Sequence, residues 1–140
     1  MVHINFLAVL AATASNVVIG FLWYGPLFGK PWAALSGFTE ETMVAAKAKG
    51  MGKNYALMML GAFLTAFVLA HALVFASAYT NTHGIPAGLM CGFWNWLGFI
   101  VPLSMGSVLW DGKPWKLFLI NVGYQLVALL AMGCILAVWT

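Results

Sequence analysis

The sequence predicts an all-α protein, an integral membrane four-helix bundle. Of its 140 residues, 64% are hydrophobic and only 6% are charged. Soluble domains carry about a quarter charged residues, so this composition excludes a water-soluble fold. Four apolar runs, at about 4–24, 55–79, 86–110 and 115–139, are each long enough to cross a bilayer. We therefore expect a single membrane domain over residues 1–140, with one long loop, the connector at 25–54.

The ends of these runs carry the signals typical of membrane helices. Gly25 and Pro26 stop the first run, and Pro86 is a good first-turn residue for the third. Aromatic residues that prefer the membrane–water interface lie near the ends of the runs: Trp23, Tyr24, Tyr55, Tyr79, Trp110, Trp115 and Trp139. The lipid bilayer is thus the first predicted partner.

The lysines predict the orientation. All six lie in the connector, in the loop after the third run or at the start of the fourth run, and the N-terminal tail, the 79–85 loop and the C-terminus carry none. Cytoplasmic loops of membrane proteins are enriched in Lys and Arg. We therefore expect the lysine-rich loops in the cytoplasm and both termini on the other side.

Two short helices are expected within the connector. The stretch 31–36 indicates a short interfacial helix closed by Gly37, and Thr39 is the predicted N-cap of a second helix that Gly50 ends. Glu40 and Glu41 in its first turn and lysines in its last turn follow the order that the helix dipole favours. The connector is interpreted as a solvated segment, with a partner-docking surface as the alternative.

A tetrapeptide repeat suggests an internal duplication. Gly-Lys-Pro-Trp occurs at 29–32 and again at 112–115, each time shortly after a Leu-Trp pair that ends an apolar run. Two tandem two-helix hairpins are therefore a hypothesis for the fold. The tryptophan, lysine and turn residues around the repeats are predicted interfacial anchors: Lys30, Trp32, Asp111, Lys113 and Trp115.

Small residues at four-residue spacing predict where helices approach closely. Gly84, Gly88 and Gly92 open the third run, and alanines at 62, 66 and 70 lie on the second. Further stripes at 8 and 12 and at 11 and 15 lie on the first run. A bundle of only four helices cannot bury all of these small-residue faces within one chain. We therefore expect a homo-oligomer or partner membrane subunits.

Several motifs resemble one family of small bacterial membrane proteins, domain of unknown function 1761. They are Gly-Phe-Leu-Trp-Tyr at 20–24 with Phe-Gly-Lys at 28–30, Met-Gly-Lys at 51–53, and Leu-Trp-Asp-Gly-Lys-Pro-Trp at 109–115, and the likeness covers essentially the whole chain. The resemblance implies the four-span fold and, with the lysine asymmetry, the bacterial inner membrane. It implies no activity.

Neutral polar residues within the runs are the candidate site, because polar groups are costly in a bilayer. Asn95 and Gln125 fall near mid-depth, Asn16 and Asn121 somewhat nearer the lysine-rich side, and Asn121 and Gln125 share a helix face. These side chains either line a site for a small neutral solute or ligand or hold the helices together. Trp94 and Trp96 point about 200° apart on a helix, so at most one faces a flat ligand.

The histidines are weak candidates for a metal or cofactor. His3, His71 and His83 all lie toward the non-cytoplasmic side, but their spacing matches no metal motif. We therefore predict no metal and no cofactor, and a structural role for His71. A nucleic-acid partner is excluded because the lysines are few and arginine is absent.

Three classes of function remain. The leading one is a non-enzymatic, oligomeric membrane protein that binds or passes a small neutral or lipophilic molecule at the level of Asn16, Asn95 and Gln125. The alternatives are an accessory subunit of a larger membrane complex and a membrane enzyme acting on a lipid or quinone. The enzyme is disfavoured because no general base, nucleophile pair or metal motif lies at a shared depth.

Overall fold

Four long apolar helices confirm the predicted four-helix membrane fold. The computed structural model describes residues 2–139, which form helices and turns without a strand. The four helical segments long and apolar enough to cross a membrane are Phe6–Leu27, Gly52–Thr80, Gly84–Leu109 and Trp115–Val138. They begin and end within a few residues of the predicted runs.

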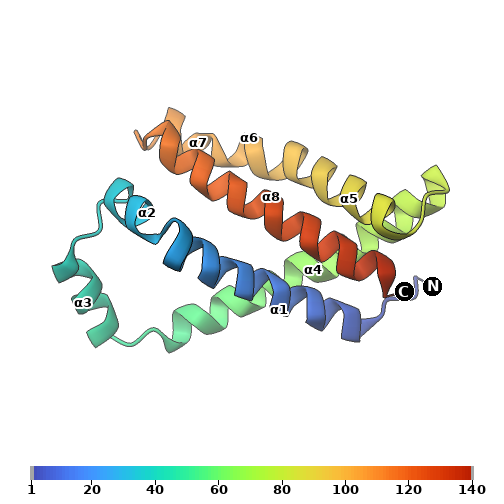
Figure 1. The fold of residues 1–140 in the computed structure, drawn as a ribbon, viewed down its shortest axis with the longest axis horizontal. Helices are drawn as coiled ribbons and strands as arrows, with labels where there is room; N and C mark the ends of the chain where they lie inside the picture. The colour runs from blue at the N-terminus through green and yellow to red at the C-terminus, as the bar shows by residue number, and fades with distance from the viewer. Residues whose placement is uncertain (1, 140) are drawn as a thin grey trace.

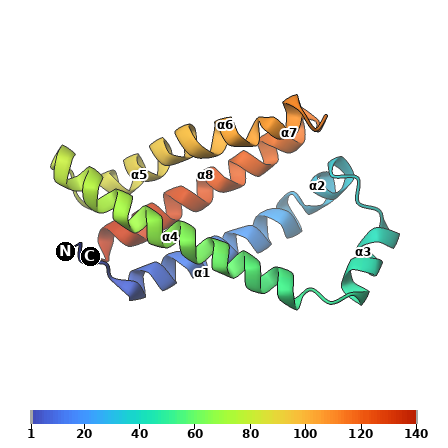
Figure 2. The same cartoon turned by 180° about the vertical axis from the view of Figure 1, so that it is seen from behind.

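Helix α8 (Trp115–Val138) is the centre of the bundle. It packs against α1 (Phe6–Leu22), α4 (Gly52–Thr80) and α5 (Gly84–Asn95), as Figures 1 and 2 show from opposite sides. Met132 of α8 and Val9 of α1 are the largest fully buried side chains. The last span of the chain is therefore surrounded by the other three.

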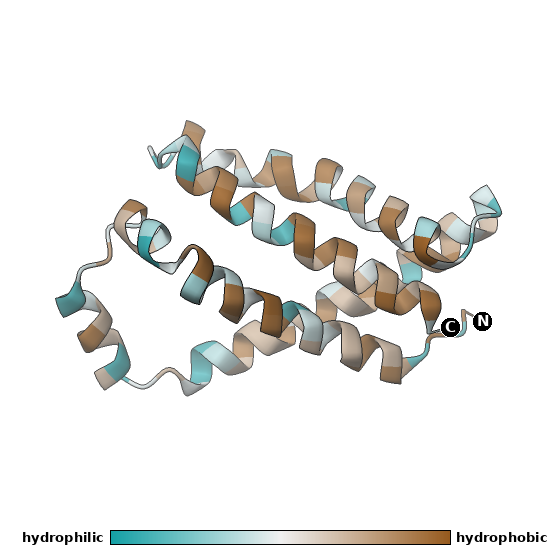
Figure 3. Ribbon diagram, in the orientation of Figure 1, coloured by the Kyte–Doolittle hydropathy of each residue, from teal (hydrophilic) through white to brown (hydrophobic). Residues whose placement is uncertain are grey.

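Both termini lie at one end of the bundle and the lysine-bearing loops lie at the other (Figure 1). The Asn5 side-chain amide donates a hydrogen bond to the Trp139 backbone carbonyl over 3.0 Å, which ties the two ends of the chain together. Figure 3 shows long hydrophobic stretches on the spanning helices and hydrophilic residues gathered in the connector. The position of both termini at the same end of the bundle agrees with an even number of spans. Which end is cytoplasmic remains a prediction from the lysines.

The closest helix approach is between α5 and α8. A Cβ atom added at Gly88 would lie 2.3 Å from the Gly133 carbonyl oxygen, and one added at Gly133 would lie 2.3 Å from the Gly88 carbonyl oxygen. At Gly92 an added Cβ would lie 2.7 Å from the Leu129 carbonyl oxygen. The predicted packing role of Gly88 and Gly92 therefore has a defined partner helix.

Gly84 differs from its predicted packing role. A Cβ at this position would meet no atom within 4 Å, so no neighbouring helix requires a glycine there. Its φ of +68° lies in the left-handed region instead, and glycine reaches this region without the strain of a side chain. Gly84 thus allows the tight turn between α4 and α5.

The connector folds as expected. It contains α2 (Gly29–Leu35) and α3 (Glu40–Ala48), and Gly37 and Gly50 follow them with positive φ angles. The Thr39 side chain accepts a hydrogen bond from the Thr42 N–H, and the Thr42 hydroxyl accepts one from the Thr39 N–H. This reciprocal capping box explains why α3 begins where it does.

The two copies of the tetrapeptide have different structures. The first lies inside α2, whereas the second forms a turn with Gly112 at φ +68° and Pro114 as the N-cap of α8. The two hairpins also differ in role, because α8 is central and α4 is peripheral. Internal duplication therefore remains a hypothesis about origin and does not describe equal halves.

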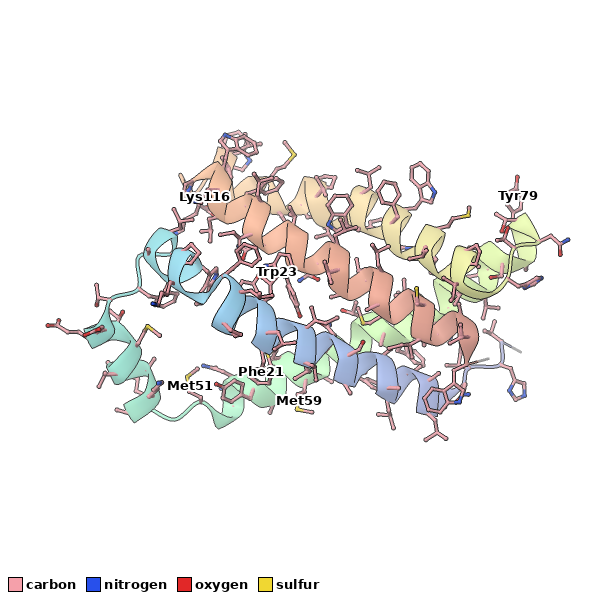
Figure 4. All side chains as sticks on the ribbon, viewed as in Figure 1. Phe21, Trp23, Met51, Met59, Tyr79 and Lys116 are labelled. Atoms are coloured by element: carbon pink, nitrogen blue, oxygen red, sulfur yellow. The ribbon has the colours of Figure 1, made fainter. Side chains whose placement is uncertain are left out.

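One π-helical turn ends the first span, and another interrupts the third. The segment η1 (Trp23–Leu27) contains Pro26 and follows α1, and η2 (Trp96–Ile100) follows α5. Their first residues donate indole N–H bonds to backbone carbonyls of α8: Trp23 to Ile120 over 3.0 Å and Trp96 to Val122 over 2.7 Å. Figure 4 shows Trp23 lying between α1 and α8. Beyond η2 the third span continues as α6 (Val101–Ser104) and α7 (Gly106–Leu109).

Candidate ligand-binding site

A cavity opens between α1, α4 and α8 in the lysine-rich half of the bundle; we call it the amide cavity. Its volume is about 560 Å³, within the range of small-molecule sites. Figures 1 and 2 show the cause: α4 diverges from α8 toward the connector, where its residues 52–61 are exposed. The residues that line the cavity are Asn16, Val17, Gly20, Phe21, Tyr24, Trp32, Tyr55, Met58, Gly61, Ala62, Thr65, Tyr124 and Gln125.

Two tyrosines, Tyr24 and Tyr124, form the inner wall of the amide cavity, and each donates to an asparagine. The Tyr124 hydroxyl donates to the side-chain oxygen of Asn16, whose backbone carbonyl oxygen lies 3.2 Å from the same hydroxyl. The Tyr24 hydroxyl donates to the side-chain oxygen of Asn121 over 2.8 Å. Each pair links α8 to the first span, so the wall also holds the bundle together.

Glycines make room for these rings. A Cβ at Gly20 would lie 3.2 Å from the Tyr124 hydroxyl oxygen, and a Cβ at Gly123 would lie 3.1 Å from the Trp23 ring. Both distances are tighter than ordinary van der Waals contact. Small residues on α1 and α8 therefore let a bulky ring lie between the two helices, which positions the tyrosine hydroxyl beside Asn16.

Unpaired amide groups face the amide cavity. Within residues 2–139, every fully buried side-chain nitrogen or oxygen atom has a hydrogen-bond partner. The Gln125 amide and Nδ2 of Asn16 are bonded to no described protein group, and both residues line the cavity. An amide without a partner at membrane depth is costly, so this surface is suited to a molecule that supplies one.

Aromatic rings enclose the outer part of the amide cavity. Tyr24 lies with its ring centre 5.3 Å from that of Trp32 and 5.2 Å from that of Tyr124, both edge to face. Phe21 and Tyr55 face each other at 6.1 Å between α1 and α4. These distances are those of favourable aromatic pairs. The cavity thus combines apolar ring faces with a few polar groups.

The predicted polar cluster is only partly assembled. Asn16 and Gln125 share the amide cavity, whereas the Asn95 amide donates to the Cys91 carbonyl of its own helix over 2.8 Å. Asn95 lines a separate cavity of about 220 Å³ between α4 and α5. Asn121 is not among the residues that line the amide cavity, although it accepts a hydrogen bond from Tyr24, which does line it. The structure therefore does not bring Asn95 together with Asn16 and Gln125 in one cavity, because α5 presents Asn95 to α4.

The paired tryptophans point in different directions, as helix geometry requires. Trp96 is bonded to α8 and packs against the core, while Trp94 is 62% exposed and borders the small cavity beside Asn95. Neither lines the amide cavity. Trp96 is therefore occupied by packing, and Trp94 lies on the outer surface of the span.

The histidines do not form one cluster. His3 and His83 line a larger cavity of about 700 Å³ at the end of the bundle that holds the termini, which we call the terminal cavity. His71 is not among its lining residues; its Nδ1 atom lies 2.9 Å from the Phe67 carbonyl oxygen, one helical turn away. Within residues 2–139, no three His, Cys, Asp or Glu side chains lie together in a way that would hold a metal ion.

The predicted anchors lie at the lysine-rich end, and one of them has a second role. Lys30, Asp111 and Lys113 are exposed, and Trp115 is half exposed. Asp111 does not cap α8, whose N-cap is Pro114. Trp32 is only partly exposed and lines the amide cavity, so its ring contributes to the site as well as to the interface.

A known protein family matches the chain over most of its length. Residues 7–137 match the family described as "Protein of unknown function (DUF1761)". The chain belongs to the DUF1761 family. The match covers all four spans of this DUF1761 protein and therefore includes every residue of the amide cavity. No curated protein and no solved structure gives a significant match.

Sequence reasoning missed the tyrosines of this DUF1761 site. Tyr24 was grouped with the interfacial aromatic residues, and Tyr124 was not considered, although both carry the hydrogen bonds of the inner wall. Tyr124 had a usable signal, because a tyrosine in the interior of a span needs a partner for its hydroxyl. Its neighbours Gly123 and Gln125, one small and one polar, pointed to the same helix segment.

Proposed function

We propose that this DUF1761 protein is a non-enzymatic membrane protein that binds a small neutral, partly apolar molecule in the amide cavity. The observation that carries the proposal is a cavity of about 560 Å³ between spanning helices, lined by Asn16 and Gln125, whose amide nitrogens donate to no described protein group. Each unmet hydrogen bond costs about 1–3 kcal/mol, so a ligand that satisfies both groups gains affinity from the protein's own polar surface.

The lining residues favour a particular ligand chemistry. No Asp, Glu, Lys or Arg is among the described residues that line the cavity, which favours a neutral molecule. An amide nitrogen donates hydrogen bonds, so the ligand carries a carbonyl, ether or hydroxyl oxygen opposite Asn16 and Gln125. A flat or branched apolar part fits between Phe21, Tyr55 and Trp32.

Binding is favoured over passage because the core closes the cavity toward the other end of the bundle. Between the amide cavity and the terminal cavity lie residues of α1, α4 and α8 that are 0% exposed: Val9, Ala12, Ala66, Ala128 and Met132. A solute that crossed would have to separate these close contacts. The proposal is therefore a binding protein, with transport as a property that a flux measurement would have to add.

Native mass spectrometry of the gently solubilised protein tests this proposal. We expect a retained small mass on the wild-type protein, its loss in the Gln125→Leu variant, and its retention in Asn95→Leu, whose side chain lies outside the cavity. Leucine matches glutamine roughly in size, so the first change removes the polar group alone. Equal retention by both variants, or no retained mass in the presence of native lipid extract, contradicts the proposal.

Oligomerisation remains part of the proposal, although most of the small residues that predicted it pack within one chain. The small residues that predicted it are largely used within one chain: Ala62, Ala66 and Ala70 are at most 7% exposed, and Gly88 and Gly92 contact α8. Many large apolar side chains on the outer surface stay available for contact with lipid or with a second copy. The same mass spectra report the subunit number and any foreign chain that marks an accessory role.

The proposed location is the bacterial inner membrane, with both termini outside the cytoplasm. The collection of all six lysines at the end of the bundle opposite the termini supports this orientation. In that orientation the amide cavity lies in the cytoplasmic half of the membrane. Its ligand would then enter from the inner leaflet or the cytoplasm.

A further inference from the structure

The terminal cavity has a chemistry different from that of the amide cavity. It lies where α1 and α5 begin and where α4 and α8 end, and it has a volume of about 700 Å³. Its apolar wall includes Ala8, Leu73, Val74 and Leu136, from three helices. A cavity of this size and lining accepts an acyl chain, because it removes the chain from contact with water.

Polar side chains without a hydrogen-bond partner among residues 2–139 lie around this apolar wall. His3, His83 and Ser77 line the cavity, and none of them hydrogen-bonds to a described residue. Asn5 is different, because its side chain caps α1 and also donates to the Trp139 carbonyl. The cavity therefore offers two imidazoles and one hydroxyl that are free to meet a head group.

Charge at this end of the bundle favours an anion. The Asp, Glu and Lys side chains all lie within 30–53 and 111–116, at the opposite end of the bundle, so among residues 2–139 no acidic side chain lies beside the imidazoles of His3 and His83. Histidine is the side chain that most readily gains a positive charge near neutral pH. A protonated imidazole forms a strong, charge-assisted hydrogen bond to a carboxylate or phosphate.

We propose that the terminal cavity binds a single-chain amphiphile with an anionic head group, the head group lying at His3 and His83 and the acyl chain against Leu73 and Leu136. A free fatty acid and a lysophospholipid share this chemistry. The site is independent of the amide cavity, from which the fully buried layer of core residues separates it. It would place an acyl ligand at the membrane surface on the side of the termini.

Photoaffinity labelling of the purified full-length protein tests this site. The probe is palmitic acid that carries a diazirine in its chain, added to protein in detergent micelles, and the labelled residues are located by peptide mass spectrometry. We expect label on segments 4–8 and 70–78, which border the cavity. Label spread evenly along all lipid-facing surfaces overturns the proposal.

Competition distinguishes head-group recognition from partition of the chain. Palmitate or palmitoyl-lysophosphatidylglycerol should suppress the label at a concentration at least about tenfold lower than hexadecanol, which has the same chain length and no charge. Suppression by palmitate alone assigns a fatty acid, and suppression by the lysophospholipid alone assigns a lipid head group. Equal potency of hexadecanol and both anions overturns the role of the imidazoles.

Variants link the result to the named residues. In the His3→Gln/His83→Gln double variant, the affinity for palmitate should fall at least about tenfold, because the loss of even one charge-assisted hydrogen bond has that effect, while the affinity for hexadecanol stays unchanged. Ala78→Trp fills the cavity from an exposed position and should block labelling. Tyr79→Trp is its matched control, because Tyr79 is 93% exposed and points away from the bundle in Figure 4. Unchanged labelling in the Ala78→Trp variant overturns the proposal.

Discussion

The crossing of α5 and α8 makes a strong quantitative prediction. In Gly88→Ala, the new methyl carbon would start 2.3 Å from the Gly133 carbonyl oxygen, and the closest atoms are backbone. Carbon–oxygen contacts settle at about 3.3 Å or more, so the two helices must separate by roughly 1 Å. A gap of that size removes a quarter to a half of the dispersion attraction between facing atoms.

The free energy of unfolding should fall by about 2 kcal/mol. Overpacking of this kind costs about 1–3 kcal/mol, and a contact with rigid backbone belongs at the upper end of that range. The higher helix propensity of alanine relative to glycine offsets about 1 kcal/mol of this cost. Unfolding of the bicelle-reconstituted protein by SDS, followed by tryptophan fluorescence, measures the difference.

Gly61→Ala is the matched control. It lies inside α4, and an added Cβ there would meet no atom within 4 Å, so the variant should be unchanged or up to about 1 kcal/mol more stable. The double variant Gly88→Ala/Gly133→Ala should lose less than the sum of its single variants, because helices already separated accommodate the second methyl group. A Gly88→Ala protein as stable as Gly61→Ala would refute the close approach of α5 to α8.

Three further predictions concern two hydrogen bonds between helices and the orientation of the protein in the membrane. Trp96→Phe should cost about 1 kcal/mol by the same SDS assay, since it removes one indole hydrogen bond to α8 while the carbonyl keeps its helical partner. Tyr24→Phe and Asn121→Leu should each destabilise by a similar amount and should not add in the double variant, because both break the same 2.8 Å bond. For orientation, Glu41→Cys should react with an impermeant thiol reagent only in inverted vesicles and Thr82→Cys only in intact spheroplasts; the opposite pattern reverses the assigned sides.

The local features of the fold were predictable from the sequence. The four spans, the two connector helices, the Thr39 cap and the stops at Gly37 and Gly50 all agree with the structure. Each depends on a short run of neighbouring residues: hydrophobic length, a capping side chain or a glycine after a helix. Such interactions act within one or two helical turns, so they can be recognised without knowledge of the partner helices.

The assembly of the candidate site was not predictable in the same way. Asn16, Asn95 and Gln125 fall within the membrane-spanning runs, but depth does not say toward which neighbour a helix turns a given face. Rotation of α5 is set by Gly88 and Gly92 against α8, and this rotation directs Asn95 toward α4. The sequence predicts the depth of each polar residue in the membrane. Helix packing determines which of these residues lie in the same cavity.

The sequence by itself determined a four-span membrane protein with its termini together and its lysines at the opposite end. Hydrophobicity and charge decide this because each span responds to the bilayer largely independently of the others. Only the tertiary structure decided that α8 is central, that Tyr124 joins Asn16, and that two cavities of different chemistry lie on either side of a closed core. These features depend on pairs of residues from different helices, which meet only when the helix backbones approach closely enough to fix their crossing and rotation.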